Sequence, residues 1–237
     1  MVYTLWLCTS FILPLAIGYH YWRKNEFFSS FMLGVFCFFI TQWILRPIFL
    51  YVVGIIYPPM LNLKLSKFDT IGVVFIAALS AGIFEEIGRY VIWKKKRNFP
   101  PSYQDAMAFG LGHASLEAVA GLGITILISI KEFHTMQFDL TSLRLILDRP
   151  IALGVHCALT IIVFYGIYKG KKEWFFVLLA VMLHFIMNFI SGIIIWGTEH
   201  SFSWASPETK FLMPFFYLVI VFIIFFYFRK LYCSKKE

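Results

Sequence analysis

The chain has 237 residues, of which 60% are hydrophobic and 14% are charged, and its formal net charge is +8. Soluble globular domains average about 25% charged residues and about 45–50% apolar ones, so this composition excludes an ordinary soluble domain. The basic residues lie in short clusters between apolar runs, a placement that argues against nucleic acid as a partner. The four cysteines form no CxxC pair, which argues against a disulfide framework or a cysteine zinc site.

Long apolar runs dominate the chain, and runs of about 20 residues can cross the roughly 30 Å hydrocarbon core of a bilayer. We therefore predict an all-α, polytopic transmembrane helix bundle of about seven spans, surrounded by the lipid bilayer. The predicted spans are Tyr3–Trp22, Phe27–Tyr57, Thr70–Trp93, Tyr103–Ile130, Pro150–Tyr168, Trp174–Gly197 and Phe211–Phe228. Only short connections remain, so residues 1–237 are expected to form a single integral membrane domain.

Two segments do not fit a simple succession of spans. The run from Phe27 to Tyr57 is too long for one straight crossing and contains Arg46 followed by Pro47. Because proline usually kinks a membrane helix, this run is expected to bend or to end in an interfacial turn. The longest connection, Lys131–Arg149, mixes leucines with charged residues without a clean period. It could be a short interfacial helix, a lid or a simple connection.

Basic residues cluster in alternate connections of the seven-span arrangement. The clusters are Arg23 and Lys24, Lys94 to Arg97, Lys169 to Lys172, and Arg229 to Lys236. Because cytoplasmic loops carry an excess of Lys and Arg, the N-terminus is expected outside and the C-terminus in the cytoplasm. The first apolar run has no basic start before it, so it is expected to remain as a membrane helix. We predict a multi-pass protein of the inner or plasma membrane.

The third to sixth predicted spans all carry ionisable side chains. Each costs roughly 2.5 kcal/mol or more at membrane depth, so such residues usually mark a function or a specific partner. They are Glu85, Glu86 and Arg89 in the third span, His113 and Glu117 in the fourth, His156 in the fifth, and His184 in the sixth, where Asn188 follows it. Residues four apart share a helix face.

Their depth is as informative as their spacing. Counted from the predicted cytoplasmic ends, Glu85, His113, His156 and His184 all lie at roughly 12–18 Å. Four helices are therefore expected to bring polar groups to one level. Small residues that let helices approach closely flank these positions, namely Gly82, Gly88, Gly110, Gly112, Gly121 and Gly123.

A purely structural role remains open for several of these residues. Arg89 could snorkel or neutralise a carboxylate, with Glu86 as its salt-bridge partner. His156 and Asn188 could each form a hydrogen bond between helices. Glu85, His113 and His184 occur as a set, and this favours a site.

The set contains the groups needed to hydrolyse an amide bond. A carboxylate beside a neutral imidazole can hold and deprotonate a water molecule, and an amide with a second imidazole can donate hydrogen bonds to a forming oxyanion. The same Glu and His side chains could instead hold Zn²⁺ with one position open for water. Spacing alone leaves both versions open, so the cofactor is either absent or Zn²⁺. The possible metal ligands are Glu85, His113, His156 and His184.

Three segments resemble the motifs of the CPBP, or type II CAAX prenyl endopeptidase-like, clan of intramembrane proteases. These are Glu85-Glu86-Ile-Gly-Arg89, Phe109-Gly-Leu-Gly-His113 and His184-Phe-Ile-Met-Asn188, in the order of the clan's EExxxR, FxxxH and HxxxN motifs. Arg89 comes one residue early, which gives EExxR. The segment from Gly110 to Glu117 is similar to a GxGHxxxE segment of the YhfC branch, and His156 would fill an additional histidine motif. The closer likeness is to the YhfC and PrsW branches.

The resemblance implies an all-α intramembrane endopeptidase. It implies that Glu85 and His113 activate water and that His184 and Asn188 form the oxyanion site. Glu86 could replace Glu85 as the base, because the early Arg89 alters the motif's register. Arg89, Glu117 and His156 would support the site. The substrate would be a membrane protein or a peptide, and nothing in the sequence points to a prenylated one.

Two other classes of function remain open. A non-catalytic membrane scaffold or immunity-type protein would use the same polar network to hold its helices together. A proton-coupled transporter could use buried Glu and His side chains as a relay. The transporter is disfavoured because the sequence shows no paired broken helices in two matching halves.

Overall fold

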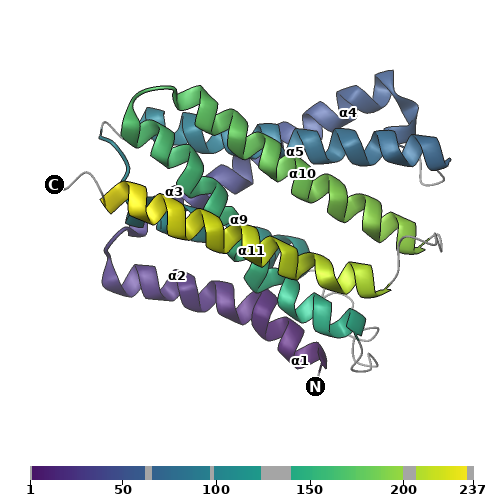
Figure 1. The fold of residues 1–237 in the computed structure, drawn as a ribbon, viewed down its shortest axis with the longest axis horizontal. Coiled ribbons are helices and arrows are strands. Elements are labelled where there is room, and N and C mark those ends of the chain that lie inside the picture. Colours follow the sequence, from purple (N-terminus) through teal and green to yellow (C-terminus); the bar gives the residue numbers. More distant parts are fainter. Residues whose placement is uncertain (1, 62–65, 97–98, 124–139, 200–206, 234–237) are drawn as a thin grey trace.

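A computed structural model describes residues 2–61, 66–96, 99–123, 140–199 and 207–233, and these residues form helices without any strand (Figure 1). The helices are α1 (Val2–Leu7), α2 (Leu13–Lys24), α3 (Phe28–Phe38), α4 (Arg46–Ile56), α5 (Lys67–Lys96), α6 (Tyr103–Glu117), α9 (Leu140–Lys169), α10 (Glu173–Glu199) and α11 (Pro207–Cys233). A π-helical segment, Cys8–Ile12, joins α1 to α2, and a second, Phe39–Leu45, joins α3 to α4. A third, Ala118–Gly123, extends α6, and a 3₁₀ turn, Pro58–Leu61, follows α4.

The predicted all-α membrane bundle is confirmed. Within the described residues, five helical stretches are long and apolar enough to cross a membrane. They are Phe28–Ile56, Phe68–Lys96, Ile146–Lys169, Glu173–Gly197 and Phe211–Cys233. The count of seven spans and the orientation of the termini stay predictions. The basic ends of α2, α5, α9 and α11 do lie at one end of the bundle, the left-hand end in Figure 1.

The long second run stays helical through Arg46 and Pro47 and does not end there. Proline has no N–H, and its ring clashes with the carbonyl four residues earlier in a regular helix. The π-helical segment Phe39–Leu45 lies immediately before this point and widens the turns that meet Pro47. The helix therefore continues to Ile56 and carries Arg46 beside α5, where its guanidinium bonds to Ser80 and Ala77.

The segment expected as the end of a long connection is also helical. Residues 140–149 form the first turns of α9, so the helix begins ten residues before the expected start at Pro150. Leu147 and Ile151, four residues apart, pack with Met187 of α10 and Met213 of α11, and this contact explains why the turns before Pro150 are ordered. Residues 131–139 of the expected connection lie outside the described residues.

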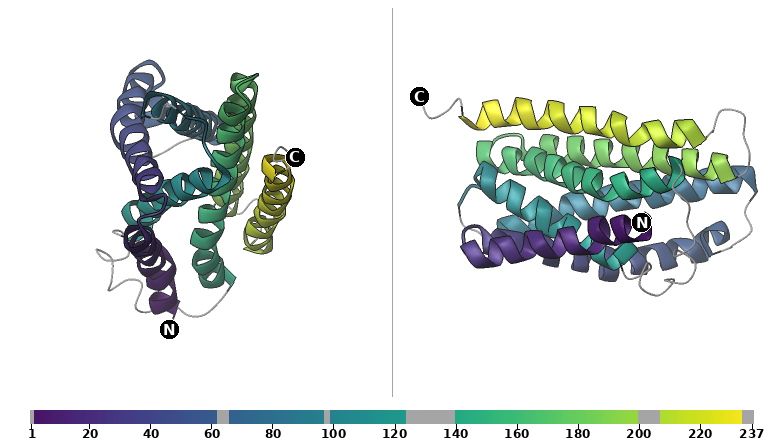
Figure 2. Two further views of the ribbon diagram at one scale, coloured as in Figure 1. Left: turned by 90° about the vertical axis from the view of Figure 1, so that its left-hand side faces the viewer. Right: turned by 90° about the horizontal axis from the view of Figure 1, so that it is seen from below.

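Helix α6 lies inside the bundle, between α3 and α9 (Figure 2). Glycines make this position possible, because a Cβ on Gly112 would lie 2.0 Å from the carbonyl oxygen of Phe31, and one on Gly34 would lie 1.9 Å from that of Phe109. A capping box fixes the start of α6, since Ser102 and Asp105 exchange hydrogen bonds with each other's backbone N–H. These contacts set the depth at which α6 presents its polar residues.

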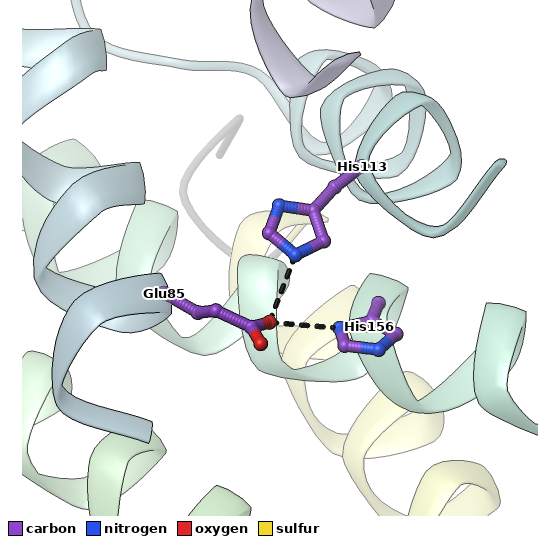
Figure 3. Close-up of side chains that lie close together, drawn as sticks. All are labelled: Glu85, His113 and His156. Carbon is purple, nitrogen blue, oxygen red and sulfur yellow. Dashed lines mark hydrogen bonds and ion pairs between the residues drawn. The ribbon is translucent and has the colours of Figure 1, made fainter. Parts of the chain in front are cut away.

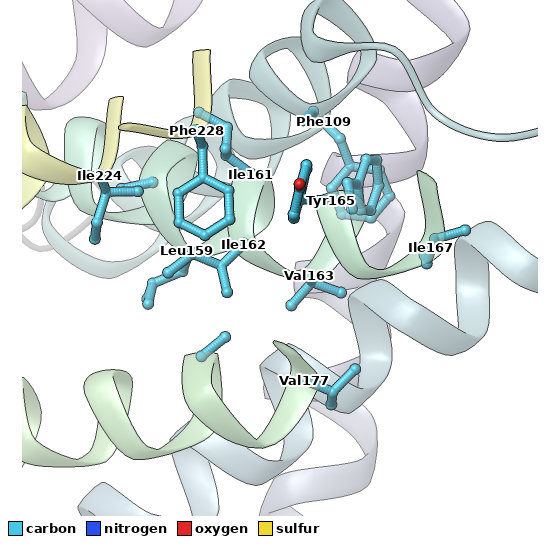
Figure 4. Close-up of a cluster of buried hydrophobic side chains, with 14 of the residues drawn as sticks. Phe109, Leu159, Ile161, Ile162, Val163, Tyr165, Ile167, Val177, Ile224 and Phe228 are labelled. Carbon is cyan, nitrogen blue, oxygen red and sulfur yellow. The ribbon is translucent and has the colours of Figure 1, made fainter. Parts of the chain in front are cut away.

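The hydrophobic core lies around the second half of α9 (Figure 4). The apolar stretch of α9 is 83% buried, against 22% for that of α10, so α9 is the central helix and α10 faces outward along much of its length. Residues from Leu159 to Tyr165 pack against Phe109 of α6, Val177 of α10 and Phe228 of α11. The same helix thus carries the core in one half and His156 next to it.

Candidate active site

Helix α5 places two carboxylates and one guanidinium in the interior. Glu85, Glu86 and Arg89 are 5%, 0% and 0% exposed, respectively. Arg89 forms an ion pair with Glu86 through Nη1, and its Nη2 lies 3.4 Å from Oε2 of Glu85. A buried ion that loses its only partner is strongly destabilising, but Arg89 has two carboxylates and keeps Glu86 as a partner if Glu85 is neutralised.

His113 of α6 contacts Glu85 directly. Its Nε2 lies 2.8 Å from Oε2 of Glu85 (Figure 3). An ionised carboxylate can only accept a hydrogen bond, so Nε2 is the nitrogen that carries the hydrogen. Nδ1 of His113 is buried without a hydrogen-bond partner. Because Nε2 carries the hydrogen, Nδ1 has a lone pair, and an unpaired buried lone pair costs less free energy than an unpaired buried N–H. The imidazole and the ring of Phe38 pack in a T-shaped arrangement with their centroids 5.2 Å apart.

His156 of α9 links Glu85 to Glu117. Its Nδ1 lies 3.6 Å from Oε2 of Glu85 and 2.8 Å from Nη2 of Arg89. Arginine can only donate, so Nδ1 of His156 accepts and Nε2 carries the hydrogen of the neutral ring. This Nε2 lies 2.5 Å from Oε2 of Glu117.

His184 of α10 completes the cluster from the other side. Its Nδ1 lies 2.7 Å from Oε1 of Glu86, and its Nε2 lies 3.9 Å from Oε1 of Glu85. The ring centroids of His113 and His156 are 5.0 Å apart, and those of His156 and His184 are 5.6 Å apart. Three imidazoles from three helices therefore surround the carboxylate of Glu85.

The structure brings together seven of the eight residues singled out from the sequence, namely Glu85, Glu86, Arg89, His113, Glu117, His156 and His184. Asn188 is the exception. It is exposed, lies one turn beyond His184, and lines cavities next to the cluster. Among the described residues, no hydrogen bond joins Asn188 to the other seven.

Two cavities reach the cluster. The first, which we call the α5 cavity, has a volume of about 360 Å³ and is lined by Gln42, Arg46 and Glu85, among others. The second, the α9 cavity, has a volume of about 210 Å³ and is lined by His156 and His184 together with residues of α9 and α11. Glu117 and Asn188 line both cavities, so these two side chains lie between the cavities.

Sequence reasoning missed two residues of the α5 cavity. Nε2 of Gln42 donates to Oε1 of Glu85 at 2.8 Å, and Nη1 of Arg46 donates to Oε1 of Gln42 at 2.8 Å. Because Arg46 can only donate, it fixes the Gln42 amide with its NH₂ group toward Glu85. The sequence signal that could have identified them is a glutamine and an arginine four residues apart within an apolar run.

Sequence reasoning also missed the polar residues at the start of α9. Nη1 of Arg149 lies 3.5 Å from Oε1 of Glu117, and Nη2 pairs with Asp148. Arg144 lines the same cavity one turn before Asp148. The sequence prediction placed these residues in a connection, because the segment shows no regular hydrophobic period. They reach the site only because this segment forms the first turns of α9.

The donor set fits a divalent metal such as Zn²⁺ in type and spacing. Donor atoms of Glu85, His113 and His156 lie within 4.8 Å of one another, as do those of Glu85, Glu86 and His184. A carboxylate with two imidazoles is a zinc-binding combination in catalytic sites. Oε2 of Glu86 is buried without a hydrogen-bond partner, so a cation would satisfy it. Arg89 competes for these donors, and His156 could bind a metal only after Arg89 leaves its Nδ1.

Comparisons with known proteins place the chain in a family. Residues 9–141 match the family model described as YhfC intramembrane metalloprotease, a region that includes Glu85 and Glu117 and ends before His156 and His184. The membrane protein YhfC of Bacillus subtilis (strain 168) is 26% identical, over 76% of this chain and 78% of that relative. No solved structure matches. The matched region exceeds half of the chain, and the chain belongs to the YhfC intramembrane metalloprotease family.

Proposed function

We propose that the chain is an intramembrane peptidase that hydrolyses a peptide bond of a membrane-associated or peptide substrate. The observation that carries the proposal is the environment of Glu85. Three imidazoles approach this carboxylate at 2.8, 3.6 and 3.9 Å inside a membrane helix bundle, and the α5 cavity reaches it. The family's description as an intramembrane metalloprotease agrees with this chemistry.

Glu85 is the general base in the proposed reaction. Its Oε2 is held by His113 and its Oε1 by Gln42, so the carboxylate has a fixed orientation before a water molecule arrives. The carboxylate removes a proton from that water as the oxygen attacks the peptide carbonyl, and the same proton is available to the leaving amine. Glu86, held by Arg89 and His184, braces the site.

His184 and Asn188 form the proposed oxyanion site. Nδ1 of His184 is held by Glu86, which turns Nε2 toward Glu85 and the reacting position. A protonated Nε2 and the Asn188 amide would both donate to the oxygen on which negative charge develops. Asn188 lines both cavities one turn beyond His184, and this supports the proposed role.

In the alternative, metal-dependent version, Glu85 would be a ligand of Zn²⁺ together with His113, His156 and His184, and the ion would polarise the carbonyl and lower the pKa of a bound water. Arg89 is the competing cation in this arrangement. We therefore expect Zn²⁺ to raise the melting temperature of the Arg89→Gln variant more than that of the wild type. Thermal unfolding of the purified proteins with and without Zn²⁺ measures this. An equal shift in both proteins would contradict a metal held by this donor set.

The proposal predicts that Glu85→Gln and His113→Ala abolish cleavage and leave accumulation in the membrane unchanged. Quenched-fluorescence peptide pools added to the purified protein in liposomes provide the measurement. Glu26→Gln is the matched control, because Glu26 is an exposed acid outside the cluster. Equal cleavage by the wild type and both variants would refute the proposal.

A non-catalytic scaffold is the second candidate, and one observation favours it. Arg89 pairs with both carboxylates, so the cluster is also a closed interhelical network. On this reading, Glu85→Gln lowers the melting temperature in detergent by several degrees, and the wild type cleaves nothing. The peptidase reading expects near-normal stability of Glu85→Gln with activity lost.

A further inference from the structure

Two guanidinium groups that the proposed reaction does not use line the α9 cavity, together with the carboxylates of Glu117 and Asp148. Two arginines, Arg144 and Arg149, line it together with His156, His184 and Asn188. Nε of both arginines is buried without a hydrogen-bond partner. Water activation and oxyanion binding use none of these guanidinium groups, so the arginines need a different explanation.

The two arginines differ in how their charge is balanced. Arg149 is 14% exposed and contacts two carboxylates, those of Asp148 and Glu117. Arg144 forms no ion pair with any residue that the structure describes. Asp148 is four residues from Arg144 and could pair with it on the same helix face. Because Arg149 engages both Asp148 and Glu117, neither of these carboxylates pairs with Arg144.

We propose that Arg144 binds a carboxylate of the substrate, and that Arg149 keeps Asp148 and Glu117 from neutralising Arg144. A guanidinium is the side chain best suited to paired hydrogen bonds with a carboxylate. The inference rests on the proposed peptidase function and names its substrate class, a peptide with an anionic group near the scissile bond. That group is either a free C-terminal carboxylate or an acidic side chain.

The position of Arg144 limits how far this group lies from the scissile bond. Twelve residues of α9 separate Arg144 from His156, which is about 18 Å along the helix axis. An extended peptide rises about 3.3 Å per residue. The substrate carboxylate therefore lies within about five residues of a scissile bond held beside His156 and His184, whose rings are 5.6 Å apart. Arg144 is also at the end of α9 opposite Lys169, so the group enters from the end of the bundle away from the basic helix ends.

Binding of defined peptides tests the inference without relying on turnover. The full-length Glu85→Gln variant in detergent is titrated with four fluorescein-labelled apolar decapeptides. The first has a free C-terminus and the second an amidated one; the third and fourth are amidated and carry Glu or Gln at the third residue from the end. We expect one carboxylate peptide to bind about 10- to 100-fold more tightly than its amide counterpart. The pair that shows the difference identifies the source of the carboxylate.

Substitutions in the same background assign the effect to its residues. Arg144→Gln and Arg149→Gln should both remove the preference, the second because it frees Asp148 to pair with Arg144. Arg144→Lys should keep part of it, and Arg229→Gln should keep all of it, because Arg229 is exposed at the other end of the bundle. Thermal unfolding of each variant shows whether it is folded. If Arg149→Gln does not fold, Arg144→Gln alone is sufficient to test the inference.

Two results would overturn the inference. One is equal affinity for every carboxylate peptide and its amide counterpart in the Glu85→Gln protein. The other is a preference that survives Arg144→Gln in folded protein. Failure of the peptidase proposal looks different, because the wild type would then cleave none of the peptides while the binding preference still gives its own answer.

Discussion

The α5 cavity and the α9 cavity reach the same cluster, but their polar groups are paired to different degrees. On the α5 side, Arg46 donates to Gln42, Ser80 and the Ala77 carbonyl, and Gln42 donates to Glu85. On the α9 side, two arginines each retain a buried Nε without a partner. The paired donors of Arg46 and Gln42 hold Glu85 in one orientation, whereas the unpaired donors on the α9 side can bind a ligand. We infer that the α5 side positions Glu85 and that the α9 side receives the substrate.

The largest effect is expected from a change that displaces both cavities together. In Gly112→Ala the new Cβ would lie 2.0 Å from the Phe31 carbonyl oxygen, so α6 must move away from α3 and carry His113 and Glu117 with it. We expect a loss of about 1–3 kcal/mol in stability and a fall of about 100-fold or more in kcat/KM. Gly154→Ala is the control, because its Cβ would be 3.4 Å from Val221. Normal activity of Gly112→Ala would show that activity does not depend on the position of α6 relative to α3.

Filling each cavity separately should give opposite kinetic results. Ala152→Phe narrows the α9 cavity and should raise KM about tenfold with a small effect on kcat, since it excludes substrate. Ala77→Phe narrows the α5 cavity and should lower kcat with a small effect on KM, since it restricts water at Glu85. Both alanines are half-buried, which makes the pair matched. Steady-state kinetics on one peptide measures the difference, and the same pattern in both variants would contradict separate roles.

A smaller effect is expected when one bond of the α5 wall is removed. Gln42→Leu deletes the hydrogen bond to Oε1 of Glu85 and leaves Arg46 without its amide acceptor. Hydrogen bonds to charged groups contribute about 1.5–3 kcal/mol, and the lower end of that range corresponds to a fall in kcat of about tenfold. Gln104→Leu is the control at an exposed glutamine. If kcat stays normal while the melting temperature falls, Gln42 only supports the fold.

The residues that the sequence identified are those whose chemistry is unusual for their location. A charge inside an apolar run is visible without a structure, and helical spacing predicted which residues share a face. This was sufficient to single out Glu85, Glu86, Arg89, His113 and His184. The common depth predicted for Glu85, His113, His156 and His184 agrees with the approach of the three imidazoles to Glu85. Arg46 was equally visible, but Pro47 directed attention to a kink instead of to the groups that its guanidinium could reach.

The differences between the sequence-based prediction and the structure depend on tertiary packing. The start of α9 at Leu140 follows from contacts of Leu147 and Ile151 with α10 and α11, which no local period reveals. Arg144 and Arg149 face the site only because that helix begins early. The pairing of His156 with Glu117 and Arg89 also depends on how α6 and α9 approach each other, and Gly110 permits that approach because its Cβ would lie 2.6 Å from Cα of Cys157.

The most direct test of the central claim follows the oxygen of the attacking water. The purified protein in liposomes is incubated with a peptide pool in water enriched in oxygen-18, and the products are read by mass spectrometry. We predict new C-terminal carboxylates that each carry one oxygen-18 atom for the wild type, and none for Glu85→Gln at unchanged melting temperature. Absence of such products from the wild type, or equal amounts from both proteins, would contradict a peptidase in which Glu85 activates water.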